Sequence, residues 1–266
     1  MDLYDIGDRL YIEGKYEDAI KYFEKSLENE EDKNSSLNYI GCCYIKLERY
    51  EEALRVFDEV LESRLWERPL FNKGRVYLKL GEYSEALACF NRALMVNPDE
   101  SDVSYYLGVY YDKIGNYETS KYYYEEAIKI EYNDSEYHLN LAVACFRTKD
   151  YNRALEESDI SISLDDSSSN ANAYCNKAYI LYRLKRYKDS LETYLKAINM
   201  IPSDTEVMNM IANCYSDLKE YDKCLYWLDE VLSIDHCNEE ATAHKKAHYF
   251  TKPGLARLRN VLGARC

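Results

Sequence analysis

Residues 70–98 read LFNKGRVYLKLGEYSEALACFNRALMVNP, and this stretch decides the fold. Apolar and small residues recur in it at steps of three and four, which places them on one face of a helix. Gly81 stands where a first helix must stop, because glycine readily adopts the left-handed conformation of a helix end. Pro98 follows the second apolar run, where its missing N–H ends a helix. The stretch therefore predicts two amphipathic helices, which we call helix A and helix B, joined by a short turn.

The same pattern occurs seven times along the chain. Each copy carries a tyrosine just after the predicted turn, and neighbouring tyrosines are 33 to 36 residues apart. These tyrosines are Tyr16, Tyr50, Tyr83, Tyr117, Tyr151, Tyr187 and Tyr221. A fixed period of this size is typical of stacked helical repeats, in which each unit packs only on its neighbours. We predict one array with repeats at residues 1–33, 34–66, 67–100, 101–134, 135–168, 171–204 and 205–237.

Small residues and aromatic rings recur in phase with the tyrosines. Nine residues before each tyrosine is a small residue: Gly7, Gly41, Gly74, Gly108, Ala142, Ala178 or Ala212. Seven residues after it the copies carry, in order, Phe23, Phe57, Phe90, Tyr124, Ser158, Tyr194 and Leu228. Two helices approach closely only where one offers a hydrogen or a methyl group, and a ring can then fill the gap beside it. We interpret the repeated tyrosine itself as a packing element that sets the register of the stack.

With these positions in phase, residues 70–98 resemble a tetratricopeptide repeat, and seven consecutive matches cover roughly residues 1–237. The resemblance implies an all-α fold, a right-handed α-solenoid of antiparallel helix pairs in which helix A lines a concave groove. Repeats five to seven depart from the family pattern, because they carry alanine where the family favours glycine. Repeat five also has Ser158 in place of a ring or leucine.

Two segments stand apart from the regular repeats. The spacing between Tyr151 and Tyr187 is two residues longer than most, and the extra residues fall near LDDSSSNANA, residues 164–173. The preceding segment is rich in serine and β-branched residues, which are weaker helix formers, so we predict the softest joint of the array here. After the repeats, residues 238–250 have the composition of a capping helix.

Residues 251–266 form a basic tail without acidic residues, in which the charged side chains are Lys252, Arg257, Arg259 and Arg265. Three interpretations of this tail stay open at this point. It caps the last hydrophobic face, it docks on an acidic surface of the same chain or of another copy, or it contacts an acidic partner or an anionic lipid.

Composition narrows the class of protein. The chain of 266 residues has a formal net charge of −14, which disfavours the attraction to phosphate on which nucleic-acid binding depends. No apolar run approaches the roughly 20 residues that span a bilayer, and the first residues lack the pattern of a secretory signal. The nine cysteines are scattered without a CxxC spacing, which is typical of a reducing compartment. We therefore expect a cytoplasmic protein without a membrane span.

No motif predicts catalysis. The chain contains no GxxxxGK[ST], GxSxG or GxGxxG string. His244 and His248 share a helix face, but no HExxH glutamate accompanies them, so we predict no metal and no cofactor. The prediction from these absences is that the protein is not an enzyme.

Asparagines are the first candidate binding residues on helix A. One position of the repeat is occupied by asparagine in three copies, at Asn72, Asn140 and Asn176. Two further copies carry asparagine one residue earlier in the repeat, at Asn38 and Asn209, and Asn213 follows four residues after Asn209. Asparagine costs up to about 0.7 kcal/mol relative to alanine inside a helix, and its amide offers both a donor and an acceptor to a peptide backbone. The alternative is that these side chains form ordinary solvated helix surface.

Aromatic and basic residues are the second group of candidates. The residues for which we predict a role are Arg75, Tyr106, Tyr179 and Arg183, with Phe71, Tyr105, Tyr182, Lys79, Lys113 and Arg147 on the same face. Arginine and tyrosine are frequent anchors at interfaces. The alternative is packing between repeats for the rings and pairing along the helix for the charges.

The sequence thus predicts a non-catalytic scaffold that binds a peptide or a helix of a partner protein in the groove of helices A. The alternative is a regulatory receptor that changes its superhelical shape when it binds a peptide. One subclass of the family clamps the C-terminal carboxylate of chaperone peptides with a lysine and an asparagine on the first helix A. Tyr4 and Asp8 stand at those positions here, so we do not predict that ligand. Nothing in the sequence indicates whether the protein is a monomer or an oligomer.

Overall fold

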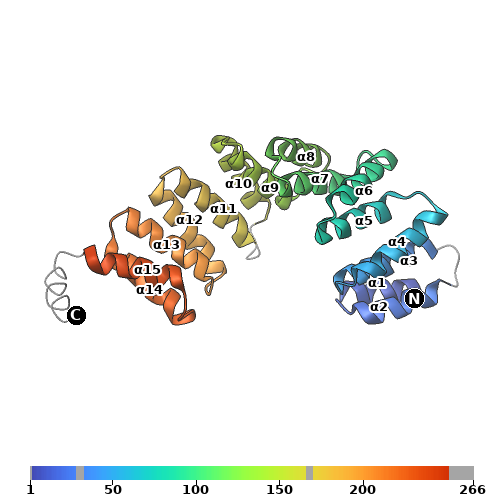
Figure 1. Ribbon diagram of the computed structural model, residues 1–266, viewed down its shortest axis with the longest axis horizontal. Coiled ribbons are helices and arrows are strands. Elements are labelled where there is room, and N and C mark those ends of the chain that lie inside the picture. The colour runs from blue at the N-terminus through green and yellow to red at the C-terminus, as the bar shows by residue number, and fades with distance from the viewer. Residues whose placement is uncertain (1, 28–32, 166–169, 252–266) are drawn as a thin grey trace. The chain divides into compact units, whose positions relative to one another are not determined.

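The computed structural model describes residues 2–27, 33–165 and 170–251, without the side chains of 248–251. The chain forms two compact units, Met1–Tyr132 and Asn133–Cys266, which are described separately (Figure 1). Their boundary falls at the end of the fourth predicted repeat, two residues before its predicted limit, although the tyrosine period continues through it without a break. The described residues contain helices and no strand, which confirms the predicted all-α fold of antiparallel helix pairs followed by one more helix. No helix in these ranges is both long and apolar enough to cross a membrane.

The first unit consists of four helix pairs. Each helix packs on the next one, and helices A of successive pairs also contact one another, α1 with α3, α3 with α5 and α5 with α7. The helices are α1 (Leu3–Ile12), α2 (Tyr16–Ser26), α3 (Lys33–Lys46), α4 (Tyr50–Ser63), α5 (Glu67–Leu80), α6 (Tyr83–Val96), α7 (Ser101–Lys113) and α8 (Tyr117–Ile130). The odd-numbered helices are helices A, and they form the layer that positions the candidate site.

The second unit continues the pattern with three pairs and a further helix. Ala241 of the last helix is fully buried in the core that α13 and α14 form with it, as expected of a cap. The helices are α9 (Ser135–Arg147), α10 (Tyr151–Leu164), α11 (Ala171–Arg183), α12 (Tyr187–Met200), α13 (Thr205–Asp217), α14 (Tyr221–Ile234) and α15 (Glu239–Thr251). The basic tail beyond Thr251 lies outside the described residues.

The turn from helix A to helix B has the same backbone conformation in all seven pairs. The residue two positions before helix B has a positive φ, between 58° and 79°, at Gly14, Glu48, Gly81, Gly115, Lys149, Lys185 and Lys219. Glycine adopts this left-handed conformation freely, whereas other residues lose about 1–2 kcal/mol in it. Because four of the turns form without glycine, the packing of the two helices must impose the turn.

The closest packing between helices A and B occurs at the repeated small residue. A Cβ built on Gly74 would lie only 2.5 Å from Cε1 and 2.7 Å from Cδ1 of Phe90. The rings Phe23, Phe57 and Tyr124 lie equally close to Gly7, Gly41 and Gly108. Each of these rings is at most 2% exposed. A glycine on helix A therefore makes the space that a ring of helix B fills, as the sequence phase predicts.

The repeated tyrosine is less buried than we expect for a core packing element. Tyr83 and Tyr221 remain 40% and 39% exposed, and the other five are partly buried. The tyrosine is the first residue of helix B, just beyond the end of helix A. In several pairs its ring contacts a ring of helix A, as between Tyr182 and Tyr187, whose centroids are 5.4 Å apart. The tyrosine covers the turn, and the ring seven residues later fills the core.

Part of the predicted soft joint, residues 166–169, lies outside the described residues. On its far side Asn170 is buried, and its Nδ2 donates hydrogen bonds to the carbonyl oxygens of Ser161 and Asp165. The Ser161 carbonyl also accepts the backbone N–H of Asp165, and the bond to the Asp165 carbonyl satisfies an acceptor just beyond α10, where the helix has ended. The softness of the joint stays a prediction.

The glycine–ring contact leads to a stability prediction. Gly74→Ala should lower the free energy of unfolding by about 1–3 kcal/mol, because the new methyl group overpacks against Phe90. Elsewhere in a helix the same change usually stabilises. Urea unfolding followed by circular dichroism measures the effect.

The chain supplies a control, since repeat seven pairs Ala212 with Leu228. The double variant Gly74→Ala/Phe90→Leu should be less destabilised than the sum of the two single variants. Strictly additive losses would show that the glycine and the ring are not coupled.

Candidate functional site

Helices A of the first unit line a cavity of about 500 Å³, which we call the aromatic pocket. Its walls combine five aromatic rings with amide, hydroxyl and charged groups. The lining residues are Tyr4, Tyr11, Ser35, Asn38, Tyr39, Cys42, Trp66, Glu67, Arg68, Phe71, Asn72, Arg75, Glu100 and Asp102. Most of them lie at equivalent steps of α1, α3 and α5, spaced three and four residues apart. The pocket is therefore the face of helix A that packing against helix B leaves open.

Two of the predicted asparagines join neighbouring helices A in the wall of this pocket. The Nδ2 of Asn72 on α5 donates to Oδ1 of Asn38 on α3, at 3.3 Å, and lies 3.3 Å from Sγ of Cys42. Both asparagines are buried, with 5% of each exposed. Much of their hydrogen-bonding capacity is thus used within the protein, and their main effect is to hold the wall of the pocket in place.

Arg75 links the aromatic pocket to a second cavity. Its Nη1 donates to Oδ1 of Asn72 at 3.2 Å. The guanidinium carbon lies 5.4 Å from the ring centroid of Phe71 and 5.1 Å from that of Tyr106, distances typical of cation–π contacts. The structure therefore brings the predicted residues Asn38, Asn72, Arg75 and Tyr106 into one connected cluster.

The second cavity, which we call the basic pocket, has a volume of about 280 Å³ and lies on α3, α5 and α7. Its lining combines aliphatic and aromatic side chains, which we call the apolar floor, with cationic groups. The lining residues are Ile45, Arg75, Leu78, Lys79, Tyr105, Tyr106, Val109 and Lys113.

Burial favours the neutral forms of three titratable groups of the aromatic pocket, Tyr11, Tyr39 and Cys42. Burial, followed by the nearby Cys42 and Cys43, raises the pKa of Tyr11 to about 12. Burial, with a smaller effect of Asp8, also raises the pKa of Tyr39, and burial raises the pKa of the Cys42 thiol to about 11. At neutral pH the pocket thus presents hydroxyl groups that can donate and a thiol that is not an activated nucleophile.

The remaining predicted residues lie in the second unit. On α11, Nη1 of Arg183 donates to the Tyr179 hydroxyl at 2.7 Å, and its guanidinium lies near the rings of Tyr179 and Phe146. Asn176 is a partly buried residue one turn before Tyr179 on the same helix.

The other three asparagines predicted as binding residues in this unit, Asn140, Asn209 and Asn213, differ in their surroundings. The Nδ2 of Asn140 donates to the backbone oxygen of Glu136, at 2.9 Å on its own helix. Asn209 is buried, and its Oδ1 has no hydrogen-bond partner within the described residues. The Nδ2 of Asn213 lies 3.8 Å from Sδ of Met210. These three amides, on helices A of the same unit, thus lie in unlike environments.

Sequence reasoning missed several lining residues of the aromatic pocket, namely Tyr11, Tyr39, Trp66, Glu67 and Arg68. The sequence could have indicated two of them. Arg68 precedes the candidate Phe71 by three residues, which places both on one helix face, and Tyr39 occupies the position of repeat two that Asn72 occupies in repeat three. Trp66 gave no such signal, since it precedes α5 and reaches the pocket from the connecting segment.

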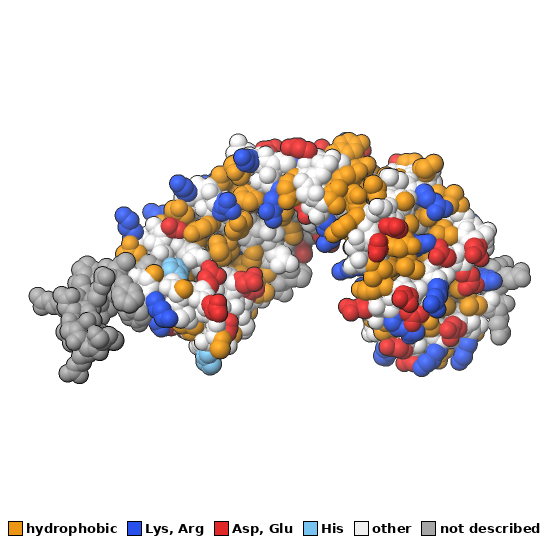
Figure 2. Space-filling model, viewed as in Figure 1, with side chains coloured by type: hydrophobic (Ala, Val, Ile, Leu, Met, Phe, Trp, Pro, Cys, Tyr) orange, Lys and Arg blue, Asp and Glu red, His pale blue; other side chains and the backbone are white. Residues whose placement is uncertain are grey.

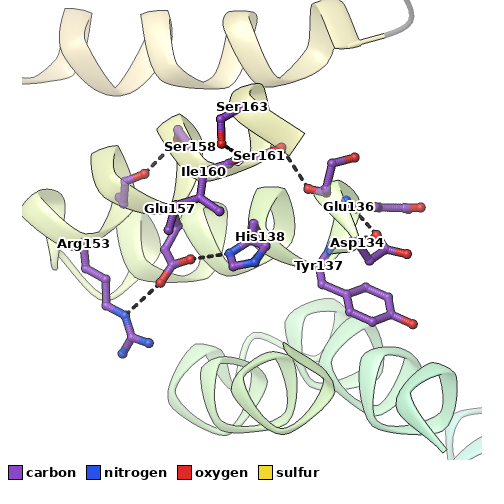
Figure 3. Close-up of polar contacts among 12 residues, drawn as sticks. Asp134, Glu136, Tyr137, His138, Arg153, Glu157, Ser158, Ile160, Ser161 and Ser163 are labelled. Carbon is purple, nitrogen blue, oxygen red and sulfur yellow. Dashed lines mark hydrogen bonds and ion pairs between the residues drawn. The ribbon is translucent and has the colours of Figure 1, made fainter. Parts of the chain in front are cut away.

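A buried polar cluster between α9 and α10 was also missed. The Nδ1 of His138 lies 2.7 Å from Oε2 of Glu157, and Nε of Arg153 donates to the other oxygen of Glu157 at 3.4 Å (Figure 3). His138 is 1% exposed and Glu157 is 8% exposed. At the two positions of repeat two that correspond to His138 and Glu157, the chain carries Leu37 and Val56. The polar pair thus replaces an apolar one inside the packing layer, which the phase of the repeat could have revealed.

Comparison with known proteins gives a consistent result. Three family models, each described as tetratricopeptide repeat, match residues 68–100, residues 4–66 and 111–162, and residues 171–204. A TPR repeat-containing protein of Methanocaldococcus jannaschii is 25% identical over 231 residues, which are 82% of this chain and 40% of that protein. The Hsp70-Hsp90 organizing protein of Triticum aestivum is 23% identical over 254 residues, which are 81% of this chain and 43% of that protein. The chain spans about two fifths of the length of these relatives.

Solved structures show the same fold. The C-terminal part of a TPR repeat-containing protein from Cytophaga hutchinsonii matches with a TM-score of 0.66 and 20% identity, over 91% of this chain and 98% of that one. YrrB, described as a TPR protein with an unusual peptide-binding site, matches with a TM-score of 0.60 and 18% identity, over 71% of this chain and 97% of that one. At these identities the similarity is one of fold.

The buried cluster leads to a second stability prediction. Glu157→Val should lower the free energy of unfolding by about 1–3 kcal/mol, because it removes the carboxylate that faces the buried His138 ring. The double variant His138→Leu/Glu157→Val reproduces the pair of repeat two and should recover most of this loss, since apolar replacements of buried polar pairs are often neutral or stabilising. Urea unfolding curves of the three proteins measure both effects. A double variant as unstable as Glu157→Val would contradict the idea that the two residues act as a pair.

Proposed function

Because the chain belongs to the tetratricopeptide repeat family, we propose that it is a non-catalytic interaction scaffold that binds a peptide or helix of a partner protein. The proposed binding site is the surface of α1, α3, α5 and α7, centred on the aromatic pocket. One observation carries the proposal: side chains from four successive repeats line this single cavity of about 500 Å³.

The chemistry of the pocket suits an extended peptide. The rings of Tyr39, Trp66 and Phe71 offer apolar area for a side chain, and such rings lose little conformational entropy on binding. The protonated hydroxyl of Tyr11 can donate to a backbone carbonyl group, whereas that of Tyr39 already donates to Asp8. The cluster of Asn72, Arg75 and Phe71 is already ordered by its internal contacts, which lowers the cost of binding.

Several features support a non-catalytic role in a reducing compartment. Cys42, the thiol of the pocket, has a pKa raised by burial and is therefore a poor nucleophile. Every cysteine of the described residues is a free thiol, which agrees with the cytoplasmic location predicted above. The formal charge of −14 favours a protein or peptide partner over a nucleic acid.

Two of the similar proteins have names in keeping with this proposal. One is an organizing protein for two chaperones, and the other is described as having a peptide-binding site. Because the chain spans less than half of the curated relatives and resembles the structures only in fold, its own partner has to be found by experiment.

Selection of a random peptide display library on the whole protein tests the proposal. We expect enriched peptides whose affinity, measured by fluorescence anisotropy, falls about tenfold or more in Trp66→Ala, which removes a wall of the aromatic pocket. The matched control is Tyr122→Ala, which removes a ring that is 53% exposed on the helix B named α8. Thermal unfolding by circular dichroism confirms that both variants are folded. Selection of no peptide, or equal loss of binding in both variants, would refute a groove on helices A.

A further inference from the structure

The basic pocket is lined by three cationic groups, those of Arg75, Lys79 and Lys113. Some basic side chains of the first unit pair with carboxylates, as Lys21 does with Asp18 at 2.8 Å and Arg49 with Glu52 at 2.9 Å. Within the described ranges no carboxylate pairs with Arg75, Lys79 or Lys113, and the guanidinium of Arg75 donates to the neutral amide of Asn72. No acidic residue is among those that line the pocket.

This arrangement is unusual for a chain with a formal net charge of −14. Figure 2 shows acidic and basic side chains interspersed on the visible surface of α1–α4, the mixture expected when charges neutralise one another locally. Three unpaired cations of one sign at a single cavity create a local positive potential, which attracts and selects an anionic group.

The positions of the lysines have a simpler partial explanation. Lys79 and Lys113 stand in the last turns of α5 and α7, where a cation interacts favourably with the helix dipole. The same step is basic in five successive repeats, at Lys46, Lys79, Lys113, Arg147 and Arg183. The helix dipole does not account for Arg75, which lies more than a turn before the end of α5 and is held between Phe71 and Tyr106.

The floor of the pocket restricts the kind of anion. Ile45, Leu78 and Val109 supply an apolar surface beside the three cations. A free phosphate ion would leave this surface uncovered, whereas a peptide that places an aliphatic or aromatic side chain next to a carboxylate would use both. The basic tail of the chain itself, residues 251–266, has the wrong charge to occupy the pocket.

We propose that the basic pocket selects an acidic segment of a partner protein, in which an apolar side chain enters the cavity and neighbouring Asp or Glu carboxylates pair with Arg75, Lys79 and Lys113. This inference rests on the proposed function, and it adds the chemical class of the ligand. The carboxylates belong to internal side chains, so a free C-terminus is not required.

Two parallel selections from the same library test the proposal, with all peptides amidated at the C-terminus in the follow-up measurements. On the wild-type protein we expect enrichment of Asp or Glu next to Leu, Ile, Phe or Met. On the variant Lys79→Glu/Lys113→Glu we expect the acidic preference to disappear and Lys or Arg to be enriched instead. The best wild-type peptide should bind about tenfold or more weakly to the variant, and an equal loss should follow when its acids are changed to Gln.

The control is Arg55→Glu/Arg92→Glu, which makes the same change of charge on exposed positions of α4 and α6, both helices B. It should leave the selected peptides and their affinity nearly unchanged, because exposed charges beyond about 10 Å are largely screened at 0.1 M salt. An equal loss in this control would show a general effect of net charge and would overturn the inference.

The outcomes separate the inference from the proposed function. The selected peptides could depend on Trp66, lack acidic residues and bind the Lys79→Glu/Lys113→Glu variant normally. This result would refute the acidic ligand but would still support peptide binding on helices A. Inorganic phosphate could displace the peptide fully when its negative charge is present at the same concentration as that of the peptide. This result would show a simple anion site without a role for the apolar floor and would also overturn the inference. Sedimentation of the protein with its peptide should give one protein chain per complex. If the selected peptides match acidic segments of this chain and the protein sediments as a dimer, the ligand is a second copy of the chain, and the proposal of a different partner protein is wrong.

Discussion

The close approach of helices A and B at the repeated small residue is the constraint on which the rest of the structure depends. At Gly74 the ring of Phe90 occupies the space that a side chain would need. This contact fixes the separation and the register of the pairs that carry it. In repeat two, where Gly41 meets Phe57, it accounts for the turn at Glu48, which adopts a left-handed conformation without glycine. The strain at such a turn is offset by burial of the ring.

Because one stripe of helix A is committed to this packing, its opposite stripe is left for other uses. In the first unit the helices α1, α3, α5 and α7 contact one another in sequence, so their open stripes lie side by side and form the aromatic and basic pockets. Arg75 belongs to both pockets. A ligand that contacts its guanidinium can therefore extend in either direction, which suits a peptide better than a small compact molecule.

Repeat five shows how far the packing rule can be relaxed. It has lost the ring, with Ser158 donating to the carbonyl oxygen of Ala154 at 2.7 Å, and it buries the pair of His138 and Glu157. Repeat six buries Tyr194 together with Ala178, so a methyl group and a ring can coexist at these two positions. The architecture thus depends on the sum of several contacts in each repeat, with no single one required in all seven.

The sequence alone determined the helix pairs, their turns and the contact of Gly74 with Phe90, because each follows from local spacing that repeats in phase. It also named Arg75, Tyr106 and Asn72 among the candidate binding residues of helix A. Only the tertiary structure decided how these polar residues are used: Asn38 and Asn72 bond to each other, whereas Asn140 bonds to its own helix. It also brought Trp66 into the pocket and left Lys79 and Lys113 without acidic partners. The physical reason is that a period fixes the direction of a side chain along its helix, whereas its partners depend on distances between helices.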